Sequence, residues 1–131
     1  MSDASYLLKE LISKFKLFSD ETRLKIYSLL LIHPDGLFVC EISSLLAVPF
    51  YNVSKHLKEL RKERLIEERR VGKYTLYFPI YENNKSDFNL LLKLIENLKD
   101  KIIDIPIYQI ERIVENRSLS LNSLCKNVKD K

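Results

Sequence analysis

Polar and basic side chains that suit nucleic-acid chemistry are concentrated in one short segment near the middle of this 131-residue chain. Tyrosine, asparagine, serine and lysine can form hydrogen bonds with base edges, and lysine and arginine also bind phosphates. Phe50 cannot make such a hydrogen bond, so we expect it to contact thymine methyl groups. The candidates for base contacts are Phe50, Tyr51, Asn52, Ser54 and Lys55, and those nearer the phosphate backbone are Lys58, Arg61 and Lys62.

The apolar residues of the same segment predict the element that positions these side chains. Val53, Leu57 and Leu60 recur at i, i+4 and i+7, so they lie on one stripe of a helix while the lysines occupy the opposite face. Pro49 suits the start of a helix, because its missing N–H would have no intrahelical partner there. We therefore predict a helix over 50–63 that packs by one face and offers the other outward.

A second helix is predicted immediately before this one. Val39, Ile42 and Leu45 repeat at helical spacing within 37–47, and Ala47-Val48-Pro49 leaves room only for a tight connection. Two short helices joined in this way are typical of a helix-turn-helix motif.

Alternating residues after Ile66 predict a β-hairpin. The segment 67–71 is charged and ends at Val71, Gly72-Lys73 follows, and 74–78 is rich in β-branched and aromatic residues. A hairpin that follows a helix-turn-helix is a wing. Its basic residues Arg69, Arg70 and Lys73 suit phosphates or a narrow minor groove, and Glu67 and Glu68 are expected to face away from DNA.

Four segments in this order resemble the ArsR/SmtB family of bacterial winged-helix repressors. They are Phe18–Ile26, Leu37–Ile42, Val53–Leu57, and Gly72-Lys73 with Tyr77, and the resemblance covers roughly residues 15 to 80. It implies a mainly α fold with a small β-hairpin wing (α+β), and a dimeric winged helix-turn-helix. It also implies a transcriptional regulator, a repressor, that binds a double-stranded inverted-repeat operator as a homodimer. The chain departs from the family at Pro49-Phe50-Tyr51, where polar residues usually open the recognition helix.

Apolar stripes at both ends of the chain predict the homodimer interface. Residues 4–18 form an amphipathic helix, and 86–103 carry a stripe that the small winged-helix core has little surface to accept. We expect a DNA-binding domain over 1–85, dimerisation helices over 86–117 and a weakly ordered tail over 118–131. The expected interface residues are Leu7, Leu11, Phe88, Leu91, Leu92, Ile95, Leu98 and Ile102.

Composition bounds the class of protein. Hydrophobic residues make up 46% and charged residues 31%, so a core can be buried, and the net charge of +4 modestly favours an anionic partner. We expect a cytoplasmic protein, since no apolar run reaches the ~20 residues that span a bilayer. The sequence has no Gly-rich phosphate loop, metal-spaced cluster or nucleophile beside a base, so neither an enzyme nor a cofactor nor a metal is expected. A protein-interaction module without DNA stays open as an alternative.

The two cysteines, Cys40 and Cys125, are the candidate sensor residues. In the resembled family one class senses metals through a Cys-x-Cys pair in the first helix of the motif, and here that segment reads Phe38-Val39-Cys40, so one thiolate is missing. Three interpretations stay open: a buried, inert Cys40, a redox or reactive-sulfur switch with Cys125, and a degenerate soft-metal or arsenite site. Two further polar residues are not expected to contact DNA: Arg23 is expected to be solvated or structurally paired, and His56 to be partly buried and hydrogen-bonded.

Overall fold

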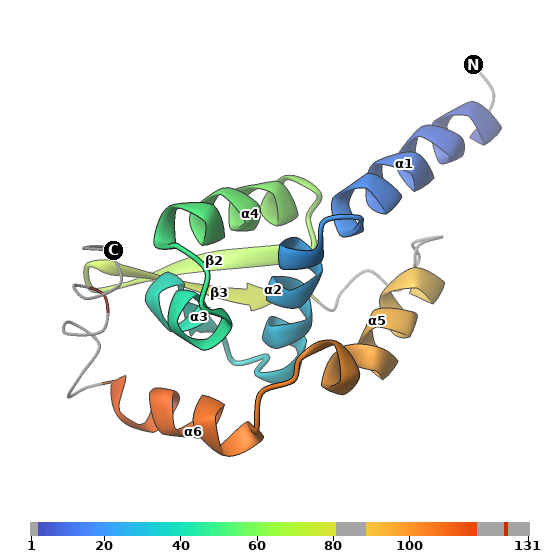
Figure 1. The fold of residues 1–131 in the computed structure, drawn as a ribbon. Helices are drawn as coiled ribbons and strands as arrows, with labels where there is room; N and C mark the ends of the chain where they lie inside the picture. Colours follow the sequence, from blue (N-terminus) through green and yellow to red (C-terminus); the bar gives the residue numbers. More distant parts are fainter. Residues whose placement is uncertain (1–2, 81–88, 118–124, 126–131) are drawn as a thin grey trace.

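The computed structural model describes residues 3–80, 89–117 and Cys125 (Figure 1). It confirms a mainly helical winged helix-turn-helix with one small antiparallel sheet. The elements are α1 (Asp3–Phe18), α2 (Glu21–Ile32), β1 (Leu37–Phe38), α3 (Val39–Leu46), α4 (Phe50–Lys62), β2 (Ile66–Val71), β3 (Tyr74–Pro79), α5 (Asn89–Ile102) and α6 (Ile107–Glu115). No helix within these described residues is long and apolar enough to cross a bilayer.

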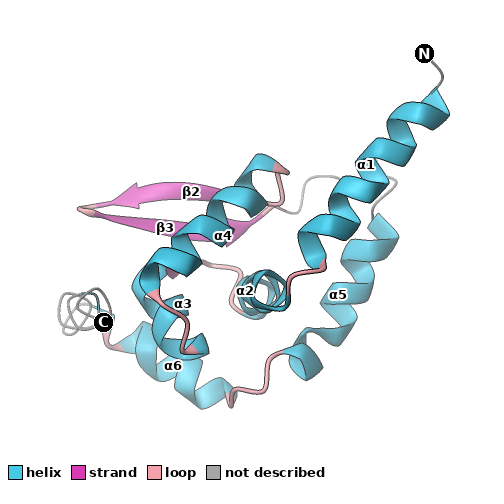
Figure 2. Cartoon of the chain, turned by 45° about the horizontal axis from the view of Figure 1, so that its top comes forward, coloured by secondary structure: helices cyan, strands magenta, loops and turns pink. Residues whose placement is uncertain are grey.

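Helix α2 forms the centre of the core. Figure 2 shows it along its axis, with α1 and α5 on one side and α3 and α4 on the other. Asp20 caps its N-terminus, since the carboxylate accepts a hydrogen bond from Arg23 N at 2.9 Å. Ile26, Leu29 and Leu30 are fully buried, so α2 is the surface on which the DNA-binding elements are assembled.

The turn of the helix-turn-helix is fixed by its backbone. Ala47 has a left-handed φ of 55°, and Val48 N donates to Ser43 O at 3.1 Å. Pro49 occupies the N-cap of α4, where its carbonyl accepts from Val53 N at 3.1 Å. The three-residue connection is therefore as tight as the sequence predicted.

The sheet has the order β1-β3-β2, and the predicted hairpin turn at Gly72-Lys73 is confirmed. Gly72 has a φ of 64°, which suits a two-residue hairpin turn. The helix predicted from residue 37 begins late, because Leu37 and Phe38 form β1 and pair with β3. Gly36 makes this possible: its φ is 113°, and a Cβ there would lie 2.8 Å from Leu76 Cγ.

The C-terminal helices pack on the body of the protein. The prediction that Ile95 belongs to a dimer interface is wrong, because its side chain is only 5% exposed and lies in the same core cluster as α2. The apolar stripe of α5 thus packs, at Ile95, against the core of its own chain. Pro106 opens α6, which buries Ile110. Phe88 and, except for Cys125, the predicted tail over 118–131 lie outside the described residues.

Candidate nucleic-acid interface

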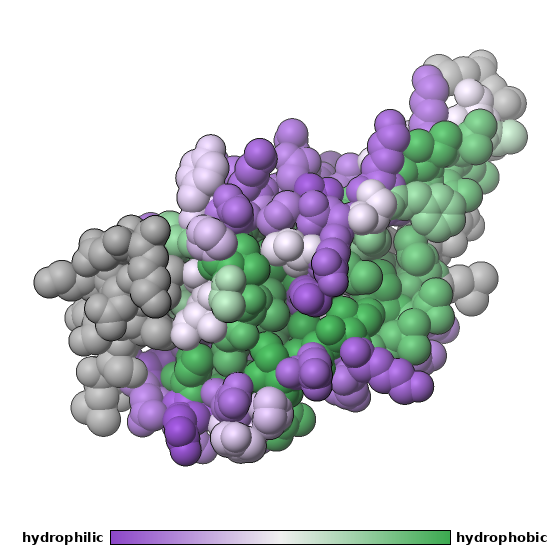
Figure 3. Space-filling model, in the orientation of Figure 1, coloured by the Kyte–Doolittle hydropathy of each residue, from purple (hydrophilic) through white to green (hydrophobic). Residues whose placement is uncertain are grey.

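Helix α4 has the two faces that the sequence predicted. Val53, Leu57 and Leu60 are fully buried, whereas the Tyr51 side chain is 75% exposed. The hydrophilic surface over α4 is visible in Figure 3. The other predicted contact residues with exposed side chains are Asn52, Lys55, Lys58, Arg61 and Lys62.

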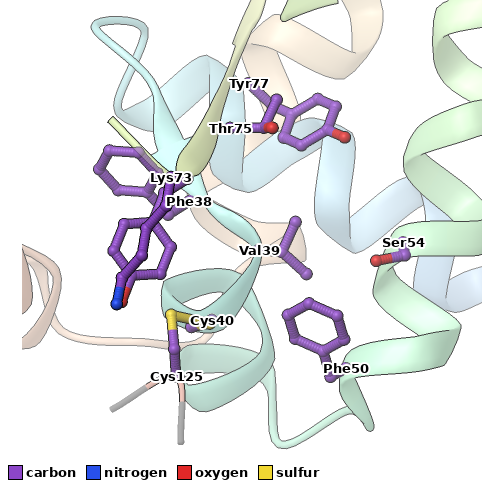
Figure 4. A pocket seen from close by; sticks show the side chains of 10 residues that line it. Phe38, Val39, Cys40, Phe50, Ser54, Lys73, Thr75, Tyr77 and Cys125 are labelled. Atoms are coloured by element: carbon purple, nitrogen blue, oxygen red, sulfur yellow. A yellow bond between two sulfur atoms is a disulfide. The ribbon is translucent and has the colours of Figure 1, made fainter. Parts of the chain in front are cut away.

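Phe50 and Ser54 differ from these residues, because both are only partly exposed and line a cavity of about 200 Å³. Figure 4 shows this cavity between α3, the N-terminal half of α4 and the wing. The Phe50 side chain therefore lines the cavity and is also partly exposed at the surface. Its contact with DNA stays a prediction.

The wing presents Arg69, Arg70 and Lys73, all of them exposed. Lys73 Nζ lies 5.5 Å from the centre of the Tyr74 ring, which in turn meets the Phe38 ring edge-on at 6.0 Å between centroids. The turn of the wing is thereby connected to the start of α3 through two aromatic rings.

Glu68 lies at the base of the wing. Its carboxylate is 2.9 Å from Arg61 Nη1, so the arginine offsets a charge that would repel phosphates. Burial, and then the neighbouring Glu68, raise the pKa of Tyr77 to about 12. Arg61 is therefore engaged with the wing, and its predicted role in phosphate binding stays a prediction.

His56 is partly buried and hydrogen-bonded, as expected, and its partner is Arg23, a contact that the sequence did not indicate. Arg23 Nε donates to His56 Nδ1 at 3.3 Å, and Arg23 Nη1 donates to Leu17 O at 3.1 Å. Burial lowers the pKa of His56, although Asp20, 3.8 Å from Nε2, opposes this shift. The neutral imidazole thus fastens α4 to the first turn of α2.

A second polar connection, between α1 and the C-cap of α4, was missed by the sequence analysis. Lys14 Nζ donates to Glu63 Oε2 at 2.6 Å, and Ser13 Oγ donates to Glu63 Oε1 at 2.9 Å. The hydrogen bond from Lys14 holds the pKa of Glu63 below its ordinary value of 4.5. Lys14 is buried, and its place three positions after Leu11 on the apolar stripe was the signal that could have identified it.

Comparison with known proteins places this geometry in a family. Residues 18–69 match the family described as a helix-turn-helix domain. The uncharacterized HTH-type transcriptional regulator MJ1325 of Methanocaldococcus jannaschii is 32% identical over 84 residues, which cover 64% of this chain and 89% of that protein. The homodimeric winged helix-turn-helix domain Mb0332 of Mycobacterium bovis, a possible ArsR-family regulator, superimposes with a TM-score of 0.58 at 25% identity, covering 77% of this chain and 89% of that one. This chain belongs to the ArsR/SmtB family of winged helix-turn-helix transcriptional regulators.

Within this family, the chain also resembles metal-resistance regulators over its DNA-binding segment. It is 39% identical over 64 residues to CadC of Listeria innocua, a cadmium resistance transcriptional regulatory protein, and the match covers 49% of this chain. The chain spans about half the length of that relative, 53%.

The outer face of α1 carries the apolar surface of this ArsR/SmtB regulator. Figure 3 shows hydrophobic surface running from α1 toward the side of the molecule that holds α5. Of the predicted interface residues, Leu7, Leu11 and Leu98 are exposed, whereas Leu91, Leu92 and Ile102 pack partly against the core. The exposed apolar residues of the two helices are Tyr6, Leu7, Leu8, Leu11, Ile12, Phe15, Leu94 and Leu98.

The two cysteines are joined by a disulfide, although 85 positions separate them in the sequence. Cys40 is in the first turn of α3, and the two residues are 2% and 3% exposed. Both line the cavity beside Phe50 and Ser54 (Figure 4). The regulator's two cysteines are therefore bonded to each other next to its candidate DNA-binding surface.

Proposed function

We propose that this regulator is a transcriptional repressor that binds an inverted-repeat DNA operator as a homodimer. The observation that carries the proposal is the division of α4, which buries one apolar stripe completely and exposes Tyr51 and Lys55 on the opposite side. An α-helix of this kind fits the major groove, where side chains near its N-terminus reach base edges. The exposed Arg70 and Lys73 of the wing supply phosphate or minor-groove contacts.

A second copy of the chain is proposed to cover the outer face of α1 together with the exposed side of α5. Among the residues of these two helices whose side chains the structure describes, eight large apolar side chains are exposed, and the structural relative Mb0332 is a homodimeric domain. In such a dimer two recognition helices meet major grooves about one helical turn apart, ~34–36 Å, which requires a two-fold symmetric operator.

The signal is proposed to be the oxidation state of Cys40 and Cys125. The disulfide ties the C-terminal part of the chain to the first helix of the helix-turn-helix, so its formation and reduction act next to α4 and the wing. Disulfides are rare in the reducing interior of cells, where those that form are usually transient or redox-sensing. The two redox states are proposed to differ in operator affinity.

The test is operator footprinting followed by affinity measurements on matched variants. Loss of a base contact costs about 1–3 kcal/mol, so Lys55→Ala and Tyr51→Ala should each weaken operator binding about 5- to 150-fold and relax sequence preference. Arg112→Ala, which removes one positive charge from the exposed surface of α6, should change affinity little. If Lys55→Ala retains full operator affinity, α4 does not read bases. A chain that binds no duplex DNA at low salt would instead be a protein-interaction module.

The redox part is tested separately, with reduced and oxidised wild type, Cys40→Ser and Cys125→Ser. Wild type should change operator affinity on oxidation, and neither serine variant should. Equal affinity of the wild type in both states would leave the disulfide as a structural bond.

A further inference from the structure

Arg117, just beyond α6, makes a set of contacts with the start of α3 that no sequence motif indicated. Its Nε donates to Glu41 Oε2 at 2.7 Å, and its Nη2 donates both to Glu41 Oε1 at 2.8 Å and to Gly36 O at 2.7 Å. The guanidinium carbon lies 5.0 Å from the centre of the Phe38 ring. The planar donor group is thus held by a bidentate carboxylate, a backbone carbonyl and an aromatic ring.

Glu41 makes this contact stronger than a surface ion pair. Glu41 is 0% exposed, and its Oε1 also accepts a hydrogen bond from Phe38 N, the N-cap residue of α3, at 2.9 Å. A buried carboxylate is stable only with a partner, and a partly buried pair is screened by salt less than a pair at the surface, although the Arg117 side chain is itself 25% exposed. Arg117 is therefore fixed to α3 by the carboxylate of Glu41, which is not exposed to water.

The position of Glu41 gives the contact a further role. Glu41 follows Cys40 directly, and Cys125 follows Arg117 by eight positions. We propose that Arg117 is a positioning residue for the Cys40–Cys125 disulfide, because its attachment to Glu41 holds the C-terminal part of the chain beside Cys40 whether or not the sulfur–sulfur bond exists. This inference rests on the thiol switch proposed above and names the residue that brings Cys40 and Cys125 together.

The size of the effect follows from loop closure. With Arg117 attached, forming the disulfide closes a loop of eight positions. Without it, the nearest buried residue before Cys125 in the part of the chain that the structure describes is Ile110, fifteen positions away, and if α6 detaches it is Ile103, 22 positions away. The probability of closing a flexible loop falls as the 3/2 power of its length, so the effective concentration of the two thiols decreases about threefold to fivefold.

The redox step with glutathione disulfide is balanced. The thiolate of one cysteine attacks a sulfur of the oxidant, forms a mixed disulfide and expels one glutathione thiolate. The thiolate of the other cysteine then attacks the protein sulfur of that mixed disulfide and expels the second glutathione thiolate. Two electrons pass to glutathione, and the two cysteine protons pass to solvent. Arg117 acts on the second, intramolecular attack, which depends on how close the two thiols are.

The experiment is a redox titration of the full chain in buffers of defined glutathione to glutathione disulfide ratio, with the disulfide fraction counted by thiol alkylation and mass spectrometry. The variants are Arg117→Met, which removes the cation, and the double variant Glu41→Gln/Arg117→Met, which also removes the buried charge while keeping an acceptor for Phe38 N. Arg112→Met is the control, since it removes an exposed arginine from α6 itself. Thermal melting of the reduced proteins reports on the fold independently.

Both Arg117 variants should require a glutathione ratio about threefold to fivefold more oxidising for half-formation of the disulfide, a shift of about 14 to 21 mV, and Arg112→Met should match the wild type. If the folded double variant titrates with the wild type, the inference is wrong, even if operator binding responds to oxidation. If the wild type forms no disulfide in oxidising buffer, the thiol switch itself fails, and the two failures are distinguishable.

Discussion

Leu8→Ala is the sharpest test of whether a second copy covers α1. The Leu8 side chain is 58% exposed, yet it lies on the apolar face of its helix. Complete burial of a leucine side chain contributes about 1.5–3 kcal/mol. Only the exposed part of Leu8 is covered in the dimer, and alanine removes most of its side-chain carbons. The substitution therefore weakens the free energy of association by about 1 kcal/mol per subunit. A two-fold dimer contains the change twice. We therefore expect a loss of about 2 kcal/mol, or a roughly 30-fold weaker dimer.

Sedimentation velocity over a dilution series measures this dissociation constant directly. Lys9→Ala, at the next position of α1 and also exposed, is the control and should leave the dimer intact. Ile95→Asp separates the interface from the core: because Ile95 is buried in its own chain, this variant should lower the thermal stability of the fold itself. If Leu8→Ala and Leu8→Asp both sediment as the wild type does, α1 is not part of the interface.

Three further predictions concern two polar connections and the wing. Lys14→Met should lower stability by about 1–3 kcal/mol at pH 7, and the difference should shrink below pH 4.5, because the lowered pKa of Glu63 stabilises the fold only while that carboxylate is ionised. His56→Gln should remove a loss of stability that the wild type shows as pH falls below 6.5, since a histidine of lowered pKa resists protonation in the fold and its neutral ring accepts from Arg23. Arg70→Ala should weaken operator and random DNA about equally and flatten the salt dependence by about one unit of slope.

Chemical denaturation at several pH values checks the first two of these predictions, and titration of both DNAs over a salt series checks the third. A difference between Lys14→Met and wild type that is the same at every pH would show that Glu63 is not the group concerned. Parallel pH profiles for His56→Gln and wild type would contradict the assigned histidine. A loss confined to the operator would mean that Arg70 reads bases.

The elements predicted correctly are those whose signal is local. The 3.6-residue period of α4, the alternation on either side of Gly72 and the short connection at Ala47-Val48-Pro49 can each be interpreted without knowing what lies across the fold. The strand β1 could not be found in this way, because a two-residue segment is too short to show a periodic pattern. Leu37 belongs to a strand only because it pairs with Tyr77 of β3.

The errors and omissions concern partners that are distant in the sequence. The stripe that contains Ile95 has the same pattern whether it packs on α2 or on a second subunit, so periodicity could not separate the two. Arg117 and Glu41 are 76 positions apart, and no local pattern connects them. The disulfide between Cys40 and Cys125 matches one of three interpretations that the sequence left open, and it could be considered only because the chain contains no other cysteines. Side chains become functional here through tertiary contacts, which a one-dimensional pattern does not contain.

Because α1 is attached to Glu63 near its C-terminal end, a small rotation at that end produces a larger displacement of its N-terminal end. At 1.5 Å per residue its 16 residues extend about 24 Å, and Figure 1 shows it projecting from the body with its far end free of the other helices. Lys14 and Ser13 hold the near end to the last turn of α4. A rotation of about 5° at that attachment therefore moves the far end by ~2 Å. If two such helices join the subunits, a small tilt of each recognition helix is converted into a change in the distance between them, and that distance selects the operators that both can reach at once.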